Sequence, residues 1–136
     1  MTDTEAEVEQ FLEAYATEFS TADPEVVASH FATPALVVAE EGNRSLEDDE
    51  AVEDLFAAVF DDLRRRDYGR SELVDLEVRA IGEARALAAV HWVRHTTEGD
   101  VLEELGTTHL LRREDGDWKM TVLVPGTPGD LPIPPA

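Results

Sequence analysis

The chain has 136 residues, no cysteine and a formal net charge of −20, because 31 acidic side chains outnumber 11 basic ones. This length predicts one domain that buries an apolar core without disulfides. The absence of cysteine excludes a thiolate nucleophile and cysteine-ligated metal sites. The acidic balance argues against a nucleic-acid partner, because no basic face would meet the phosphates.

The negative charge is spread along the chain, and Lys119 is the only lysine. Salt screens self-repulsion of this size, so we expect a protein of the halophilic type; an ordinary acidic protein is the alternative. No apolar run approaches the roughly 20 residues of a membrane span, and the first ten residues are acidic. We therefore expect a soluble, cytoplasmic protein that does not bind membranes.

Apolar side chains at helical spacing predict two longer helices in the N-terminal half. The first covers residues 4–20. The second covers residues 48–66, where acids crowd the start and residues 64–66 are all arginine, an arrangement that suits the helix dipole. Between them, Asp23-Pro24 predicts the start of a short helix that runs to about Phe31. Thr33-Pro34 ends it, and residues 35–40 are predicted to form a short strand.

Residues 84–124 are predicted to form three antiparallel strands, and the preceding elements are expected to fold onto one face of their sheet. A half-buried strand at residues 71–81 precedes them, and glycine-containing turns at 98–100 and 114–117 separate the three arms. Pairing of residues 97 and 101 places Trp92 opposite Gly106 and Arg94 opposite Glu104, which are favourable cross-strand pairs. A slip of one residue would exchange the faces. Residues 125–136, rich in proline and glycine, are predicted to form an extended C-terminal tail after a single domain at 1–124.

The order of the elements is helix, short helix, strand, long helix and four-stranded meander. It resembles the nuclear transport factor 2-like (NTF2-like) superfamily, which includes SnoaL-like polyketide cyclases and ketosteroid isomerases. The resemblance covers about residues 4–124, and its local motifs are FLEAY at 11–15, ADP at 22–24, HFATPA at 30–35 and LLRREDGDWK at 110–119. It implies an α+β, cystatin-like cone in which a curved, mostly antiparallel sheet wraps around N-terminal helices and encloses a pocket. It also implies a homodimer that packs through the outer face of the sheet.

Ketosteroid isomerase offers a comparison residue by residue. Its oxyanion-hole tyrosine corresponds to Tyr15, but the position of its general-base aspartate is similar to that of Ala39, and Thr108 replaces its second oxyanion donor. A tyrosine without a base has no proton abstraction to support, so we do not expect steroid isomerisation by that mechanism. We also find no aspartate that would complete the Asp–His pair of a SnoaL-like cyclase.

The resemblance implies a pocket with an apolar base and a polar rim. Its candidate ligand-pocket residues are Tyr15, Phe19, His30, Phe31, Trp92, Arg94, Glu104, Thr108 and Leu110. Tyr15 and His30 are the candidate catalytic residues, as hydrogen-bond donor and base, and Arg94 is a candidate for holding a ligand carboxylate. The alternatives are core roles for Tyr15, Trp92 and His30, and an ion pair between Arg94 and Glu104.

Three further histidines, His91, His95 and His109, lie on the two arms of the predicted hairpin. Residues four apart on a strand are roughly 13 Å apart, too far to share one metal ion, so no metal or other cofactor is expected. We expect these histidines on the outer face of the sheet, under a dimer partner, which would make association sensitive to pH.

Three hypotheses for the function remain. The first is a dimeric domain that binds a small organic ligand in an apolar, aromatic pocket. The second is a SnoaL-like isomerase, cyclase or hydratase that uses His30 and Tyr15 as an acid–base pair. The third is a structural dimerisation module whose cavity is filled by its own side chains. The fold supports all three and names no substrate.

Overall fold

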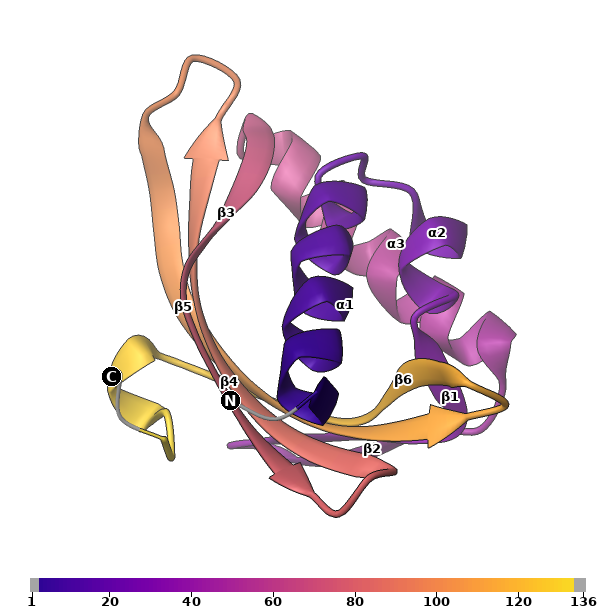
Figure 1. The fold of residues 1–136 in the computed structure, drawn as a ribbon. Coiled ribbons are helices and arrows are strands. Elements are labelled where there is room, and N and C mark those ends of the chain that lie inside the picture. Colours follow the sequence, from indigo (N-terminus) through magenta and orange to yellow (C-terminus); the bar gives the residue numbers. More distant parts are fainter. Residues whose placement is uncertain (1–2, 134–136) are drawn as a thin grey trace.

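The computed structural model describes residues 3–133, which form one six-stranded sheet with three helices on its concave side (Figure 1). The strands lie in the order β2-β1-β6-β5-β4-β3. The elements are α1 (Asp3–Phe19), α2 (Pro24–Ala28), β1 (Phe31–Ala39), β2 (Gly42–Leu46), α3 (Asp49–Arg65), β3 (Tyr68–Ile81), β4 (Arg85–Thr96), β5 (Val101–Glu114), β6 (Asp117–Gly126) and the short 3-10 helix η1 (Pro128–Asp130). No helix within residues 3–133 is long and apolar enough to cross a membrane.

The three helices form where the sequence predicts them, although α2 ends at Ala28 and Phe31 begins β1. The Asp48 carboxylate accepts a hydrogen bond of 2.9 Å from the backbone N–H of Ala51, which caps the N-terminus of α3. The Asp23 carboxylate caps α2 in the same way, with Pro24 at the first helical position. Local capping therefore sets where these two helices begin.

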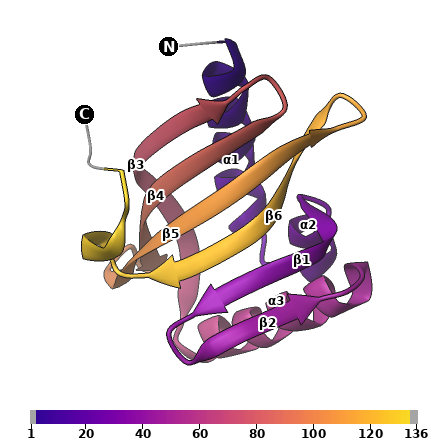
Figure 2. The same cartoon turned by 90° about the horizontal axis from the view of Figure 1, so that it is seen from below.

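Strands β3 to β6 form an antiparallel meander, and β1 adds to the edge of β6 in parallel (Figure 2). The predicted α+β fold, with a curved and mostly antiparallel sheet around N-terminal helices, is confirmed. Strand β2 was not predicted, because its segment GNRSL is polar and only Leu46 is buried. It forms as an edge strand because the turn after β1 returns the chain antiparallel to that strand.

The core lies between the helices and the concave face of the sheet. Val8, Leu12 and Tyr15 of α1 are each at most 5% exposed, which confirms the apolar stripe predicted for this helix. Phe19 packs against Phe60 of α3 with ring centroids 4.8 Å apart. Ring pairs of this kind stabilise a fold by about 0.5–1.5 kcal/mol beyond the burial of their area. This aromatic contact holds α1 against α3.

The register predicted between β4 and β5 is wrong by one residue. Trp92 lies opposite Leu105 rather than Gly106, and Arg94 lies opposite Glu103 rather than Glu104. Because side chains alternate between the two faces of a strand, this difference exchanges the inner and outer faces of β5. The inner face of β5 carries Leu105, Thr107, His109 and Leu111.

The geometry of the connecting loop explains the register. The backbone N–H of Gly99 donates to the carbonyl of Thr96 at 3.0 Å, and Gly99 has a φ of +94°. The N–H of Thr96 donates to Asp100 at 2.8 Å, so the loop has three residues and ends with its glycine in the left-handed region. A bulge at Leu102 then shifts the ladder by one residue before Arg94 meets Glu103.

The C-terminal segment departs from the extended tail that was predicted. Pro125 and Gly126 belong to β6, and the chain then forms η1 and folds back over the outer face of the sheet, on the side opposite α1 (Figure 1). Ile133 is only 7% exposed there. Gly106 allows this approach, since a Cβ at that position would lie 2.4 Å from the carbonyl oxygen of Thr127. Residues 134–136 of the predicted tail lie outside the described residues.

Candidate functional site

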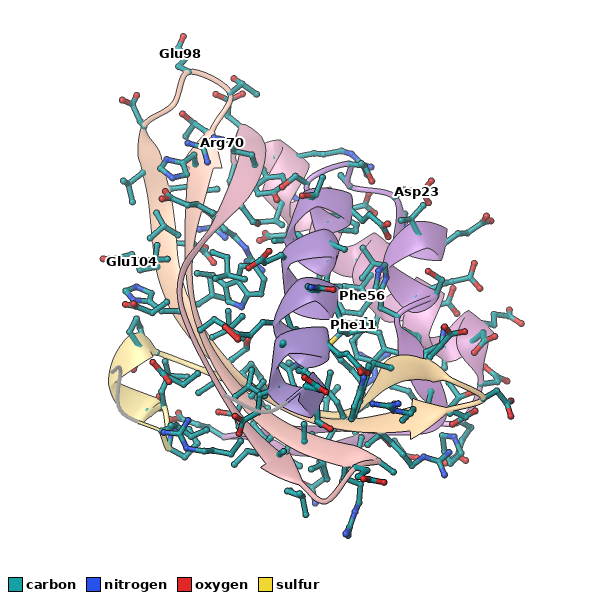
Figure 3. The ribbon with its side chains drawn as sticks, in the orientation of Figure 1. Phe11, Asp23, Phe56, Arg70, Glu98 and Glu104 are labelled. Carbon is teal, nitrogen blue, oxygen red and sulfur yellow. The ribbon has the colours of Figure 1, made fainter. Side chains whose placement is uncertain are left out.

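A cavity of about 280 Å³ lies between α1, α3 and the inner face of the sheet. Its walls are mostly apolar and aromatic, with a few polar side chains from α1, β3, β4 and β5. The lining residues are Tyr15, Phe19, Val37, Leu55, Phe56, Val59, Ser71, Trp92, Arg94, Leu105, Thr107, His109, Leu123 and Pro125. Phe56 of α3 is only 5% exposed, and Figure 3 labels it among the helices of the concave side.

Three of these residues form a buried hydrogen-bonded triad. The indole N–H of Trp92 donates to the Thr107 hydroxyl oxygen at 2.7 Å. The same oxygen lies 2.8 Å from Nε2 of His109, two residues further along β5 on the same face. The register of β4 against β5 brings Trp92 next to Thr107, so the triad is a direct consequence of the loop that joins the two strands.

Burial keeps the ring of His109, in the triad, and the ring of Tyr15, beside it, uncharged. Burial lowers the pKa of His109 to about 4, so its imidazole is neutral at pH 7. Burial also raises the pKa of Tyr15, although the nearby Arg94 opposes the effect. The Tyr15 ring meets those of Trp92 and His109 edge-on, with centroids 6.1 and 6.5 Å away. Within residues 3–133, nothing hydrogen bonds to the Tyr15 hydroxyl.

A chain of ion pairs includes the one charged side chain of the cavity lining. Arg94 lies 5.5 Å from the centroid of the Phe19 ring and donates to Glu103 at 2.9 Å. Glu103 also pairs with Arg66, which follows the end of α3. The expected partner of Arg94 was Glu104; the shifted register replaces it with Glu103. The positive charge of Arg94 is therefore already balanced by a carboxylate.

Four of the predicted pocket residues line the cavity: Tyr15, Phe19, Trp92 and Arg94. His30 and Phe31 do not. Phe31 is a core residue whose ring centroid lies 5.4 Å from that of Phe56.

The His30 ring contacts Tyr15 edge-on at 5.3 Å, but its polar atoms are engaged elsewhere. Nδ1 lies 3.0 Å from the carbonyl oxygen of Val26, and Nε2 lies 2.9 Å from the carboxylate of Glu18. Both ring nitrogens thus face helix α1 and helix α2 rather than the cavity, which leaves no nitrogen of His30 to act on a bound molecule.

The shifted register moves the other three candidates, Glu104, Thr108 and Leu110, to the outer face of β5. Figure 3 shows Glu104 on the side of the sheet away from α1. There its carboxylate lies 3.1 Å from Nε2 of His91. The residues that take their place inside are Leu105, Thr107 and His109, together with apolar side chains from α3, β1 and β6.

The three histidines of the hairpin do not share one face. His109 is buried on the inner face, contrary to the prediction, whereas His91 contacts Glu104 and His95 contacts Glu72 at 2.8 Å. No group of three or more histidine, aspartate or glutamate side chains between residues 3 and 133 is arranged to hold a metal ion.

Helices on the concave side of a curved sheet, with a cavity between them, define a protein of the cystatin-like or NTF2-like fold class. The chain belongs to the family described as "NTF2-like protein (DUF6841)", whose profile matches residues 5–128. No curated protein matches the sequence.

Solved structures with the same fold have little sequence in common with this chain. An NTF2-like protein of unknown function from Pseudomonas putida KT2440 has a TM-score of 0.74 and 17% identity, over 93% of this chain and 87% of that one. A domain of unknown function with a cystatin-like fold from Nostoc punctiforme has a TM-score of 0.73 and 16% identity, covering 93% and 78%. An NTF2-like protein from Novosphingobium aromaticivorans has a TM-score of 0.71 and 14% identity, covering 88% and 79%. At these identities the likeness extends to the fold alone.

Proposed function

We propose that this protein is a small-molecule-binding domain and that its ligand occupies the cavity between α1, α3 and the sheet. The observation that carries the proposal is the lining, in which aromatic and aliphatic walls surround a few fixed polar groups. This is the usual composition of small-molecule sites, whose volumes begin at roughly 300 Å³. An apolar cavity of about 150 Å³ holds benzene, so about 280 Å³ suits one ring with a short substituent.

The contacts of the candidate catalytic residues favour binding over the SnoaL-like isomerase, cyclase or hydratase. A general base must reach the proton that it abstracts. Both nitrogens of His30 are held by Val26 and Glu18, and the neutral His109 has a pKa of about 4, too low for a strong base at pH 7. Tyr15 remains in the cavity as a hydrogen-bonding group without a basic partner.

Identification of a natural ligand tests this proposal. The protein would be purified in molar salt from its native host and denatured, and the released compounds would be identified by mass spectrometry. The variant Leu55→Trp places an indole into the cavity from α3, whereas Val74→Trp, at a site that is 43% exposed, is the matched control. We expect one compound to be enriched with the parent and Val74→Trp but not with Leu55→Trp. Equal recovery from all three proteins would contradict the proposal.

We also propose that two copies associate through the outer face of the sheet. A row of half-buried apolar side chains crosses four strands on the face of the sheet away from the helices. Each side chain in the row pairs with the next, in the order Leu87, Leu110, Val122 and Leu36. Such an apolar row on a sheet favours coverage by a second surface. The variant Leu110→Lys should convert the dimer to a monomer in sedimentation equilibrium. The control Thr108→Lys, at the neighbouring outward position, should weaken the association of the two copies less. A parent protein that is monomeric at high concentration would refute this.

The net charge of −20 supports one further proposal, that the protein works in concentrated salt. Screening of the repulsion between its carboxylates would then supply part of its stability.

A further inference from the structure

The triad of Trp92, Thr107 and His109 holds more hydrogen-bond donors than it uses. Each of the three side chains carries one proton on nitrogen or oxygen, because the pKa of His109, about 4, leaves its ring with a single N–H at pH 7. The triad has two hydrogen bonds, both to the Thr107 oxygen. One of the three protons is therefore left over, whichever nitrogen of His109 is protonated.

The position of the surplus proton depends on the tautomer of His109. If Nδ1 carries the proton, the Thr107 hydroxyl donates to Nε2. The Nδ1–H is then a buried donor without an acceptor, because Nδ1 is buried and has no hydrogen-bond partner among the described residues. If Nε2 carries the proton, the Thr107 oxygen accepts from both Trp92 and His109, and its own O–H is free. Buried donors without an acceptor are rarer in proteins than under-used acceptors. Thr107 lines the cavity and is 8% exposed, so its O–H can reach a bound molecule.

We propose that Thr107 is the hydrogen-bond donor of the cavity and that it selects an uncharged, mostly apolar ligand with a carbonyl oxygen. Trp92 and His109 occupy both lone pairs of the Thr107 oxygen, which fixes the hydroxyl and leaves only its proton for the ligand. Among residues 3–133, Thr107 has no further hydrogen-bond partner. This inference rests on the proposed function, because it names the ligand class for the same cavity.

The charges around the cavity favour a carbonyl over a carboxylate. The guanidinium of Arg94 is already paired with Glu103, and the hydroxyl of Thr107 and the ring of His109 are neutral. A buried carboxylate needs a compensating charge, and the net charge of −20 would repel an anion from the protein as a whole. A carbonyl oxygen needs only a donor. The hydroxyl of Tyr15, also in the lining, can serve as a second one.

Three small aromatic probes test the proposal. Acetophenone has the carbonyl, α-methylstyrene has the same shape with a methylene in place of the oxygen, and benzoate has the charge. Binding would be followed by the indole N–H resonance of Trp92, assigned with the variant Trp118→Phe, since the chain has two tryptophans. One net hydrogen bond makes acetophenone bind roughly three- to tenfold more tightly than α-methylstyrene, and benzoate should bind most weakly.

Substitutions on β5 locate the donor. Thr107→Val should equalise acetophenone and α-methylstyrene while α-methylstyrene still binds, and Thr107→Ser should preserve the preference. Thr108→Val is the matched control, because it removes the same hydroxyl from the next residue, on the outer face. Three results would overturn the inference while the proposed function stands. The preference for acetophenone could survive Thr107→Val, the parent could bind acetophenone and α-methylstyrene equally, or benzoate could bind more tightly than acetophenone. If none of the probes shifted Trp92 at millimolar concentration, the proposed function itself would fail.

A measurement without ligand or variant completes the test. In a long-range ¹H–¹⁵N spectrum of the parent, His109 should show the Nε2–H tautomer at pH 7. The Nδ1–H tautomer would mean that the Thr107 hydroxyl donates its hydrogen bond to Nε2 of His109 and has no proton left for a ligand. That result would overturn the inference even if the protein binds aromatic compounds.

Discussion

The variant His109→Gln should change how the stability of the protein depends on pH. The ring of His109 has a pKa of about 4 when folded, against 6.5 in an unfolded chain. Between these values the unfolded state binds more protons, so the free energy of unfolding falls as the pH falls. At about 1.36 kcal/mol per pH unit, this contribution amounts to about 3 kcal/mol. It is complete above pH 6.5 and lost by about pH 4.

Glutamine at this position has no titrating group but still offers Thr107 an amide. The assay is urea unfolding of parent and variant at pH 4, 5, 6 and 7 in one concentration of salt. The 31 acidic residues titrate in both proteins, so the informative quantity is the difference in unfolding free energy between the two. We expect the advantage of the parent over His109→Gln to shrink by about 3 kcal/mol from pH 7 to pH 4.

The control His91→Gln removes a histidine from the outer face and shows how much of the effect comes from losing any one histidine. A difference between the parent and His109→Gln that stays constant from pH 7 to pH 4 would refute the reasoning. It would mean that the ring is not kept neutral by its burial.

Three more perturbations follow from the packing and the charge. Gly106→Ala should destabilise the fold by about 1–3 kcal/mol and expose the C-terminal segment to protease, because its Cβ would collide with Thr127. The control Gly129→Ala should change neither, because its Cβ would lie at an ordinary contact distance of 3.8 Å from the Thr127 hydroxyl oxygen. Phe60→Ala, at a fully buried site in α3, should lower the free energy of unfolding by about 3–5 kcal/mol in urea denaturation. The melting temperature should rise steadily with sodium chloride up to molar concentration; a flat response would show that repulsion between carboxylates costs little.

The sequence was sufficient to predict the type and order of nearly all elements. Helical spacing of apolar residues such as Val8, Leu12 and Tyr15 predicts a helix that covers a core, and these side chains are buried. Strand β2 escaped prediction because its polar residues have no alternation to detect. An edge strand of this kind depends on the partner that it meets and on the preceding turn, neither of which a local pattern contains.

Pairing of residues 97 and 101 predicts the wrong inner face of β5, because Thr96 and Asp100 close the three-residue loop instead and a bulge follows at Leu102. A signal within the strand itself favours the observed face. Over residues 105–112, the set Leu105, Thr107, His109 and Leu111 contains no charged side chain at neutral pH, whereas the alternate set ends with Arg112. Burial of an unpaired charge is costly, so the uncharged set is the better inner face of this stretch. The bulge at Leu102 that produces this register has no comparable signal.

The parallel pairing of β1 with β6 bears on how the chain folds during synthesis. Phe31 in β1 lies beside Met120 in β6, so one partner is made long before the other. At about 5–20 residues per second, β1 waits on the order of 5–20 s for its neighbour. During that time its apolar residues and one of its edges are open, which favours pairing with the wrong strand. Nascent chains that stop before β6 should therefore be more prone to aggregate, and more dependent on chaperones, than chains that extend beyond it.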